Sequence, residues 1–182
     1  MQRVWRCLVV ALTMQFLASP VHAWLVQPPE SDPQFNDAQA AGLAMLTALA
    51  DLLQRFAVAE AGDTDLQLPA ETDLFSLAES FRVLSAAAPT RNFQVNADIL
   101  EFVDAEFGRL NIPRPEDTST AYGLIADQLD ILAGDVKELN ALGWGPTTSS
   151  DVQRRQISNR IFSDIARVLR VSNIVALLLQ AG

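Results

Sequence analysis

The chain has 182 residues, of which 49% are hydrophobic and 19% charged, and its formal net charge is −9 at pH 7. This acidity argues against a general binder of nucleic acid or of anionic lipid. The only cysteine and the only histidine, Cys7 and His22, lie near the N-terminus. If that segment is removed, the chain lacks the side chains that zinc, haem and most nucleophilic chemistry usually require, so we expect no cofactor.

Residues 1–23 have the three-part pattern of a secretory signal peptide. Two arginines precede an apolar run, Cys7 to Ala18, which is followed by small residues at Val21 and Ala23. The run is too short for a membrane span, and the alternative is a retained N-terminal anchor helix. We predict cleavage after Ala23, export to the periplasm or the medium, and no stable membrane span in the mature chain.

Cleavage would leave 159 residues, enough for one domain with its own core. These residues contain 11 basic and 22 acidic side chains, a net charge of −11, and the two signs are unevenly distributed. Residues 24–150 carry six basic and twenty acidic groups, whereas residues 151–182 carry five basic and two acidic ones. This difference favours pairing between the basic C-terminal segment and the acidic rest of the chain.

Residues 24–34 contain three prolines and are predicted to form an extended leader. After this leader, apolar residues recur every three or four positions, and strand signals are scarce. We therefore predict five amphipathic helices, over residues 35–61, 69–88, 96–110, 116–142 and 150–180.

Local signals support several of these boundaries. Pro69 suits a first helical turn, Asn96 suits a helix cap, and Pro113 with Pro115 breaks the chain before the fourth helix. Short connections between long helices predict an all-α fold, an antiparallel bundle of four to five amphipathic helices, as one domain over residues 35–182. Ten apolar residues are expected to share one core: Leu46, Leu49, Phe81, Ile99, Val103, Phe107, Leu129, Leu132, Ile161 and Ile165.

Acidic residues cluster on two of the predicted helices. One set is Asp98, Glu101, Asp104 and Glu106, and the other is Asp127, Asp130, Asp135 and Glu138. Oxygen ligands of this kind suit calcium or magnesium. Both sets lie opposite the apolar stripes, however, so we interpret them as solvated outer faces and expect no metal site.

Glu79-Ser80 resembles, over these residues alone, the Glu-Ser pair of the lytic transglycosylases, a family in which the glutamate is the single catalytic acid. The downstream Gly-Leu-Met-Gln-type segment of that family is missing, and residues 82–85 continue the same predicted helix. We therefore interpret Glu79 as a surface residue.

The predicted C-terminal helix carries the most suggestive pattern, because its arginines accompany an apolar stripe and an uncharged run starts at Val171. One interpretation is the central helix of the bundle, with its arginines paired to the acidic helices and its apolar end buried. The other is a helix that binds a partner or lies on a membrane surface. In either case, residues 171–182 should pack against apolar surface.

From these patterns we expect an exported, non-catalytic protein that binds another protein as an envelope accessory or adaptor, or that self-associates through the C-terminal helix. Trp144 lies in a Gly-Trp-Gly-Pro turn and either contacts a partner or folds back on the core. The alternatives are a carrier of an apolar small molecule in the bundle interior and a carboxylate-only cell-wall hydrolase. The predicted contact residues are Trp144, Arg154, Arg155, Arg160, Arg167, Arg170, Ile174 and Leu178.

Overall fold

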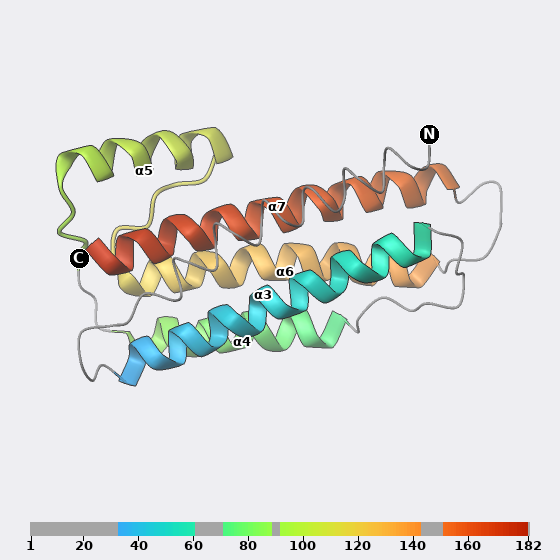
Figure 1. Ribbon diagram of the computed structural model, residues 1–182, viewed down its shortest axis with the longest axis horizontal. Coiled ribbons are helices and arrows are strands. Elements are labelled where there is room, and N and C mark those ends of the chain that lie inside the picture. The colour runs from blue at the N-terminus through green and yellow to red at the C-terminus, as the bar shows by residue number, and fades with distance from the viewer. Residues whose placement is uncertain (1–32, 61–70, 89–91, 143–150, 182) are drawn as a thin grey trace.

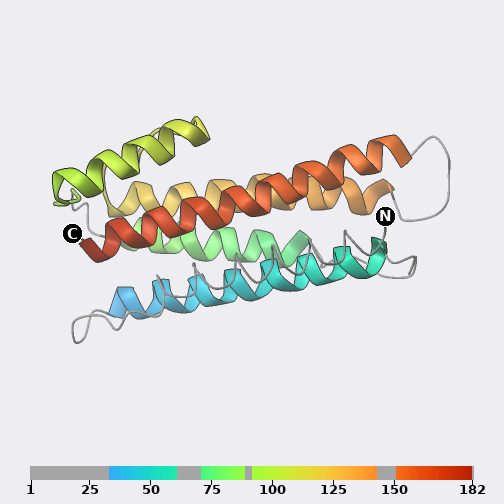
Figure 2. The same cartoon turned by 45° about the horizontal axis from the view of Figure 1, so that its top comes forward.

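The computed structural model describes residues 33–60, 71–88, 92–142 and 151–181, and these contain five α-helices. They are α3 (Pro33–Glu60), α4 (Glu71–Ala87), α5 (Ala97–Leu110), α6 (Thr118–Leu142) and α7 (Asp151–Ala181). Four of them, α3, α4, α6 and α7, run up and down as antiparallel neighbours (Figure 1). The shorter α5 lies outside this group, along the C-terminal half of α7 (Figure 2). The predicted all-α bundle is confirmed.

The helices begin and end within two residues of their predicted limits. Pro33 does not belong to the extended leader that the sequence predicts but is the first residue of α3. This position suits proline because its missing N–H needs no partner there. The predicted signal peptide, the rest of the leader and the Pro69 helix start lie outside the described residues. None of the helices that are described is long and apolar enough to cross a membrane.

Asparagine residues fix both ends of α5. The Asn96 side chain accepts a hydrogen bond from the backbone N–H of Ile99 at 2.9 Å, which confirms the predicted cap. At the other end Asn111 adopts a left-handed conformation with φ of 53°. This turn lets the N–H of Ile112 donate to the carbonyl of Phe107 at 3.1 Å, so the last carbonyls of the helix are satisfied.

A reciprocal cap starts α6. The backbone N–H of Thr120 donates to Asp117 Oδ1 at 2.7 Å, and the N–H of Asp117 donates to Thr120 Oγ1 at 3.1 Å. The backbone N–H and the hydroxyl of Thr120 both donate to the Asp117 carboxylate, and these two bonds lower the pKa of Asp117. Asp117 also forms an antiparallel β-bridge with Asn92, so the segment that carries α5 leaves the bundle and returns to it at one point.

The main core lies between α3, α4, α6 and α7. The largest buried side chains include Phe56, Phe81, Leu129 and Leu132, each at most 1% exposed. The rings of Phe56 on α3 and Phe162 on α7 are 5.1 Å apart, which ties the first helix to the last. Seven of the ten residues predicted to share one core belong to this cluster.

The other three predicted core residues are on α5, and the prediction of a single core is wrong for them. Val103 and Phe107 form a second buried cluster with Ile174 and Leu178 of α7, and Ile99 is half-buried at its edge. The reason is that α5 lies outside the bundle. Its apolar stripe therefore packs against the outer side of α7 and not against the main core.

Candidate interaction face and acidic seam

Four of the predicted contact residues come together on one side of α7. Ile174 and Leu178 are buried against Val103 and Phe107 of α5. Arg170 lies one turn and Arg167 two turns before Ile174 on α7, and both reach α5 as well. We call Arg167, Arg170, Ile174 and Leu178 the covered face of α7, because each of the four contacts α5.

The two arginines of the covered face bind different groups of α5. The Arg167 guanidinium donates to the backbone carbonyl of Leu110, at the last turn of the helix, at 2.7 Å. The Arg170 Nε lies 3.0 Å from a carboxylate oxygen of Glu106. Arg109 pairs with the other oxygen of Glu106. Because Glu106 is buried, with only 8% of its side chain exposed, these charge-assisted bonds replace the water that it loses.

The remaining predicted contact residues lie elsewhere. Arg154 donates to the carbonyl of Leu142 at 3.5 Å, near the start of α7, and Arg155 is exposed on the same turn. Arg160 faces α6. Trp144 lies outside the described residues.

Arg160 is part of an ionic group between α6 and α7 that we call the acidic seam, made of Asp135, Glu138, Arg160 and Asp164. Two Arg160 nitrogens donate to the two oxygens of Asp135 at 3.0 Å each, and one also binds Glu138. The pairing of C-terminal arginines with acidic helices, expected if α7 is a central helix, is therefore observed at Arg160 and Arg170.

Asp164 gives the acidic seam an unusual titration. Burial, together with a hydrogen bond to Asp135 and the negative charge of that residue, raises the pKa of Asp164 to about 6. Arg167 and Arg160 act in the opposite direction but do not cancel the effect. At acidic pH, the protonated Asp164 carboxyl donates to the Asp135 carboxylate.

This carboxyl pair is poorly arranged for glycoside hydrolysis. Glycosidases hold two carboxyl groups about 5–9.5 Å apart so that the sugar, or the sugar and a water, fits between them. Asp135 and Asp164 hydrogen-bond directly, and Arg160 occupies both oxygens of Asp135. The arrangement is that of a packed ionic contact between helices.

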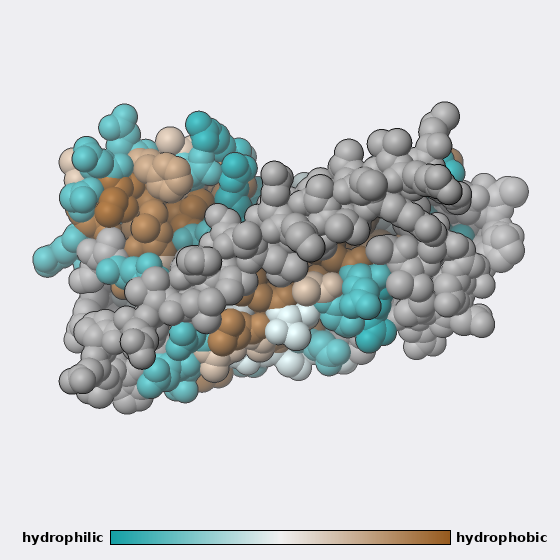
Figure 3. Space-filling model, viewed as in Figure 1, coloured by the Kyte–Doolittle hydropathy of each residue, from teal (hydrophilic) through white to brown (hydrophobic). Residues whose placement is uncertain are grey.

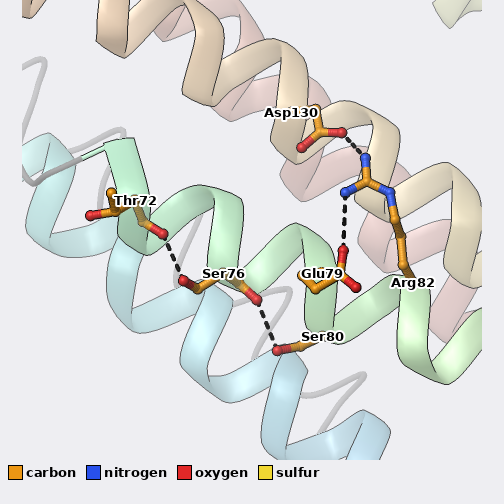
Figure 4. A network of polar contacts seen from close by, with 6 residues as sticks. All are labelled: Thr72, Ser76, Glu79, Ser80, Arg82 and Asp130. Atoms are coloured by element: carbon orange, nitrogen blue, oxygen red, sulfur yellow. Dashed lines mark hydrogen bonds and ion pairs between the residues drawn. The ribbon is translucent and has the colours of Figure 1, made fainter.

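Glu79, the residue of the Glu-Ser pair, lies on the exposed side of α4 (Figure 4). Its carboxylate is 3.6 Å from Arg82, which also pairs with Asp130 of α6 and so joins the two helices. Ser80 donates to the backbone carbonyl of Ser76 one turn earlier at 2.9 Å. Nothing in these contacts singles out Glu79 as a catalytic acid, in agreement with its interpretation as a surface residue.

The two acidic sets are less uniformly solvated than we expected. Asp98, Glu101 and Asp127 are exposed. Asp104 pairs with Arg114 at 3.3 Å, however, and Glu106 is buried, so the interpretation as solvated faces is wrong for Glu106. Within the described part of the chain, no group of three or more histidine, cysteine, aspartate or glutamate residues is arranged to hold a metal ion.

Sequence reasoning missed the roles of Glu106 and Asp164, although a signal was present. Glu106 follows Ile99 and Val103 at spacings of seven and three, and Asp164 follows Ile157 and Ile161 in the same way. Both acids therefore fall in register with an apolar stripe, where a helix turns its side chains toward a neighbour. An acid at such a position predicts a buried or half-buried ion pair.

Comparison of the chain with protein-family models, with curated proteins and with solved structures finds no match in any of the three. The site must therefore be interpreted from its own geometry.

Proposed function

We propose that this chain is an exported, non-catalytic helical-bundle protein that binds another protein through its C-terminal helix, as an envelope accessory or adaptor. One observation carries the proposal. Four of the eight residues that the sequence marks for contact lie together on the covered face of α7, outside the main core, and that face already holds a helix. A surface that binds one amphipathic helix has the chemistry to bind another.

The main core supports binding on the outside of the bundle. Large side chains such as Phe56, Phe81 and Leu129, with exposures of at most 1%, occupy the space between the four helices. Carriage of an apolar molecule would require these close-packed side chains to move apart. Apolar residues also reach the surface where α5 lies (Figure 3), and Phe102 of α5 is 53% exposed.

The carboxylate-only hydrolase is the second candidate. The raised pKa of Asp164 is the one property that it shares with a catalytic acid, whereas its contacts with Asp135 and Arg160 are those of a packed ionic contact. A turbidity assay on cell-wall suspensions separates the two candidates. Under our proposal the protein does not clear the suspension, and Asp164→Asn gives the same turbidity as the unmodified chain. Clearing that Asp164→Asn abolishes would establish the hydrolase.

Photo-crosslinking tests the proposed function in the native cell envelope. A photoreactive phenylalanine analogue replaces Arg155, an exposed predicted contact residue of α7, or Phe102, which is exposed on α5, the helix that packs against the covered face. Val83 on the outer side of α4 serves as the control position. We expect an adduct of reproducible mass, identified by mass spectrometry, from at least one of the first two positions and none from Val83. No adduct from either position, or the same adducts from all three, would contradict the proposal.

A further inference from the structure

The segment that carries α5 is attached to the bundle as a separate unit. The bridge between Asn92 and Asp117 brings its two ends together, so residues 93–116, which connect α4 to α6, form a loop closed at its base. No residue of α5 is among the buried residues of the main core, and Leu110 only borders it. The four-helix core therefore does not depend on α5 for its large buried side chains.

The contacts between α5 and the covered face define what that face accepts. Val103 and Phe107, four residues apart and so on one side of α5, fill the apolar part formed by Ile174 and Leu178. Glu106, directly before Phe107, supplies the carboxylate for Arg170 at 3.0 Å. The face thus selects an amphipathic helix with two apolar residues four positions apart and an acid beside the second.

The positive charge of the covered face indicates the sign of the charge on the helix that it binds. Arg167 and Arg170 border the apolar pair, and both direct their guanidinium groups to acceptors of the docked helix. A basic helix would leave these two cations facing like charge, whereas a helix with an acid satisfies Arg170. Charge complementarity therefore points to an acidic amphipathic helix.

We propose that α5 occupies, within the folded chain, the docking site for an acidic amphipathic helix of the partner protein, and that this helix displaces α5 from α7. This inference rests on the proposed function, because it names the site and the kind of segment that the partner presents. The internal helix competes with the partner helix. The apparent affinity for the partner therefore equals the intrinsic affinity of the free face multiplied by the fraction of molecules in which α5 is released.

Competition makes a quantitative prediction that a peptide can test. The probe is a fluorescently labelled synthetic peptide of residues 92–112, which carries the recognition pattern of α5, and the readout is fluorescence anisotropy on the full-length mature chain. Val103→Ala/Phe107→Ala in the chain removes apolar contacts from α5 but leaves the covered face intact. We expect this variant to bind the peptide at least tenfold more tightly than the unmodified chain does.

Matched variants separate displacement from general loosening. Phe102→Ala changes an exposed aromatic residue of the same helix and should leave peptide affinity as in the unmodified chain. Glu106→Gln in the chain weakens α5 docking without making a cavity, so it keeps the test valid if the double alanine variant fails to fold. It should tighten peptide binding severalfold, and adding Ile174→Ser should abolish the gain. If neither folded α5 variant binds the peptide more tightly than the unmodified chain, the inference is overturned.

A second copy of the chain is the competing occupant, and sedimentation distinguishes it. A concentration-dependent dimer that Val103→Ala/Phe107→Ala abolishes would assign the covered face to exchange of α5 between copies and would overturn the assignment to another protein. The inference and the proposed function also fail separately. If Arg155 crosslinks to a protein but the peptide does not bind, the proposed function is supported and the inference about the covered face is contradicted. If the peptide binds but no crosslinked protein is found, the helix-docking site on α7 is supported and the proposed function is contradicted.

Discussion

Glu106 shows how one carboxylate can hold two helices together from a position where an apolar residue would ordinarily stand. It lies between Val103 and Phe107 on the buried side of α5, and its two oxygens are used by Arg170 and Arg109. Removing its charge leaves Arg170 facing a neutral group while the surrounding apolar contacts remain. The ion pair therefore contributes to the position of α5 more than to the main core.

Glu106→Gln should weaken the docking of α5 on α7, because both arginines lose a charged acceptor. We expect about 1–2 kcal/mol, less than the roughly 3–5 kcal/mol of a fully buried pair, since Arg109 and Arg170 are more than half exposed. Urea denaturation followed by circular dichroism measures the effect. Glu101→Gln, an exposed acid on the same helix, is the control and should change stability by less than about 0.5 kcal/mol. Equal effects of the two substitutions would contradict the role assigned to Glu106.

Asp164 makes the stability of the protein depend on pH in an unusual direction. Its pKa is raised from 3.8 to about 6 in the folded chain, so the folded protein keeps a proton that the unfolded chain has released between these pH values. Stability is then lost as pH rises through this window, and the loss is complete above the folded pKa. A neutral side chain at this position avoids that loss.

Asp164→Asn should therefore raise the melting temperature at pH 7.5 and have little effect near pH 4. Because Asp164 is only half-buried, we expect about 1 kcal/mol, or roughly 2–4 °C, which is less than the full shift in pKa would give. Differential scanning calorimetry from pH 4 to pH 8 measures the difference, with Asp127→Asn on the exposed side of α6 as the control. A gain that is the same at every pH would show that the charge of Asp164 is not its cause.

At the scale of the elements, the helices follow closely from the sequence, whereas the place of α5 does not. Its stripe of Ile99, Val103 and Phe107 has the same spacing as the stripes of the bundle helices. Periodicity states that a helix buries one face, but not which neighbour covers it. The bridge between Asn92 and Asp117, which places α5 outside the bundle, involves two polar residues without a sequence signal.

The candidate face was predictable in part for a related reason. The uncharged run that starts at Val171 predicts burial, and the structure confirms it for Val171, Ile174, Val175 and Leu178. The run is buried because it meets two partners, the main core on one side and α5 on the other. Sequence alone marks these residues for contact, but it does not separate a partner in the same chain from a partner in another.

The cap at Asn96 should control the stability of α5 alone. Its side chain satisfies the N–H of Ile99, so Asn96→Ala leaves that donor to water and should cost about 1 kcal/mol. Since α5 is outside the main core, we expect faster hydrogen exchange in residues 97–110 and unchanged exchange in α6. Mass spectrometry of peptic fragments measures both, with Gln94→Ala as an exposed control. Faster exchange throughout α6 would mean that α5 and the bundle unfold as one unit.

For the whole molecule, the predicted cleavage of the signal peptide would decide which residues the working protein contains. We predict that the mature chain begins at Trp24, because a basic start, an apolar run and small residues precede it. Intact mass spectrometry of protein from the envelope fraction should then give a chain without cysteine or histidine. Ala23→Arg, which removes the small residue before the cleavage site, should leave the uncleaved precursor. Purified native protein with an intact N-terminus would contradict the prediction and would restore Cys7 and His22 to any account of its chemistry.

The C-terminal half of α7 connects the two parts of the molecule, because successive residues point to different cores. Ile174 is buried in the cluster with α5, and Val175 is buried in the main core. A truncation at either position removes methyl groups from a packed environment, but the two cavities lie in different cooperative units. The pair therefore tests whether the covered face is energetically separate from the bundle.

Val175→Ala should lower the global free energy of unfolding by roughly 2 kcal/mol and speed hydrogen exchange in α4, α6 and α7 alike. Ile174→Ala should act chiefly on α5, because the helix can detach while the four-helix core keeps its packing. In the Ile174→Ala variant, the amides of residues 97–110 in α5 should exchange faster. The melting temperature of the bundle should change much less than it does in Val175→Ala. Hydrogen exchange and calorimetry on both variants measure these effects. If Ile174→Ala lowers protection in α4 and α6 as much as in α5, the covered face is part of the bundle core, and a partner helix could not take the place of α5 without unfolding the chain.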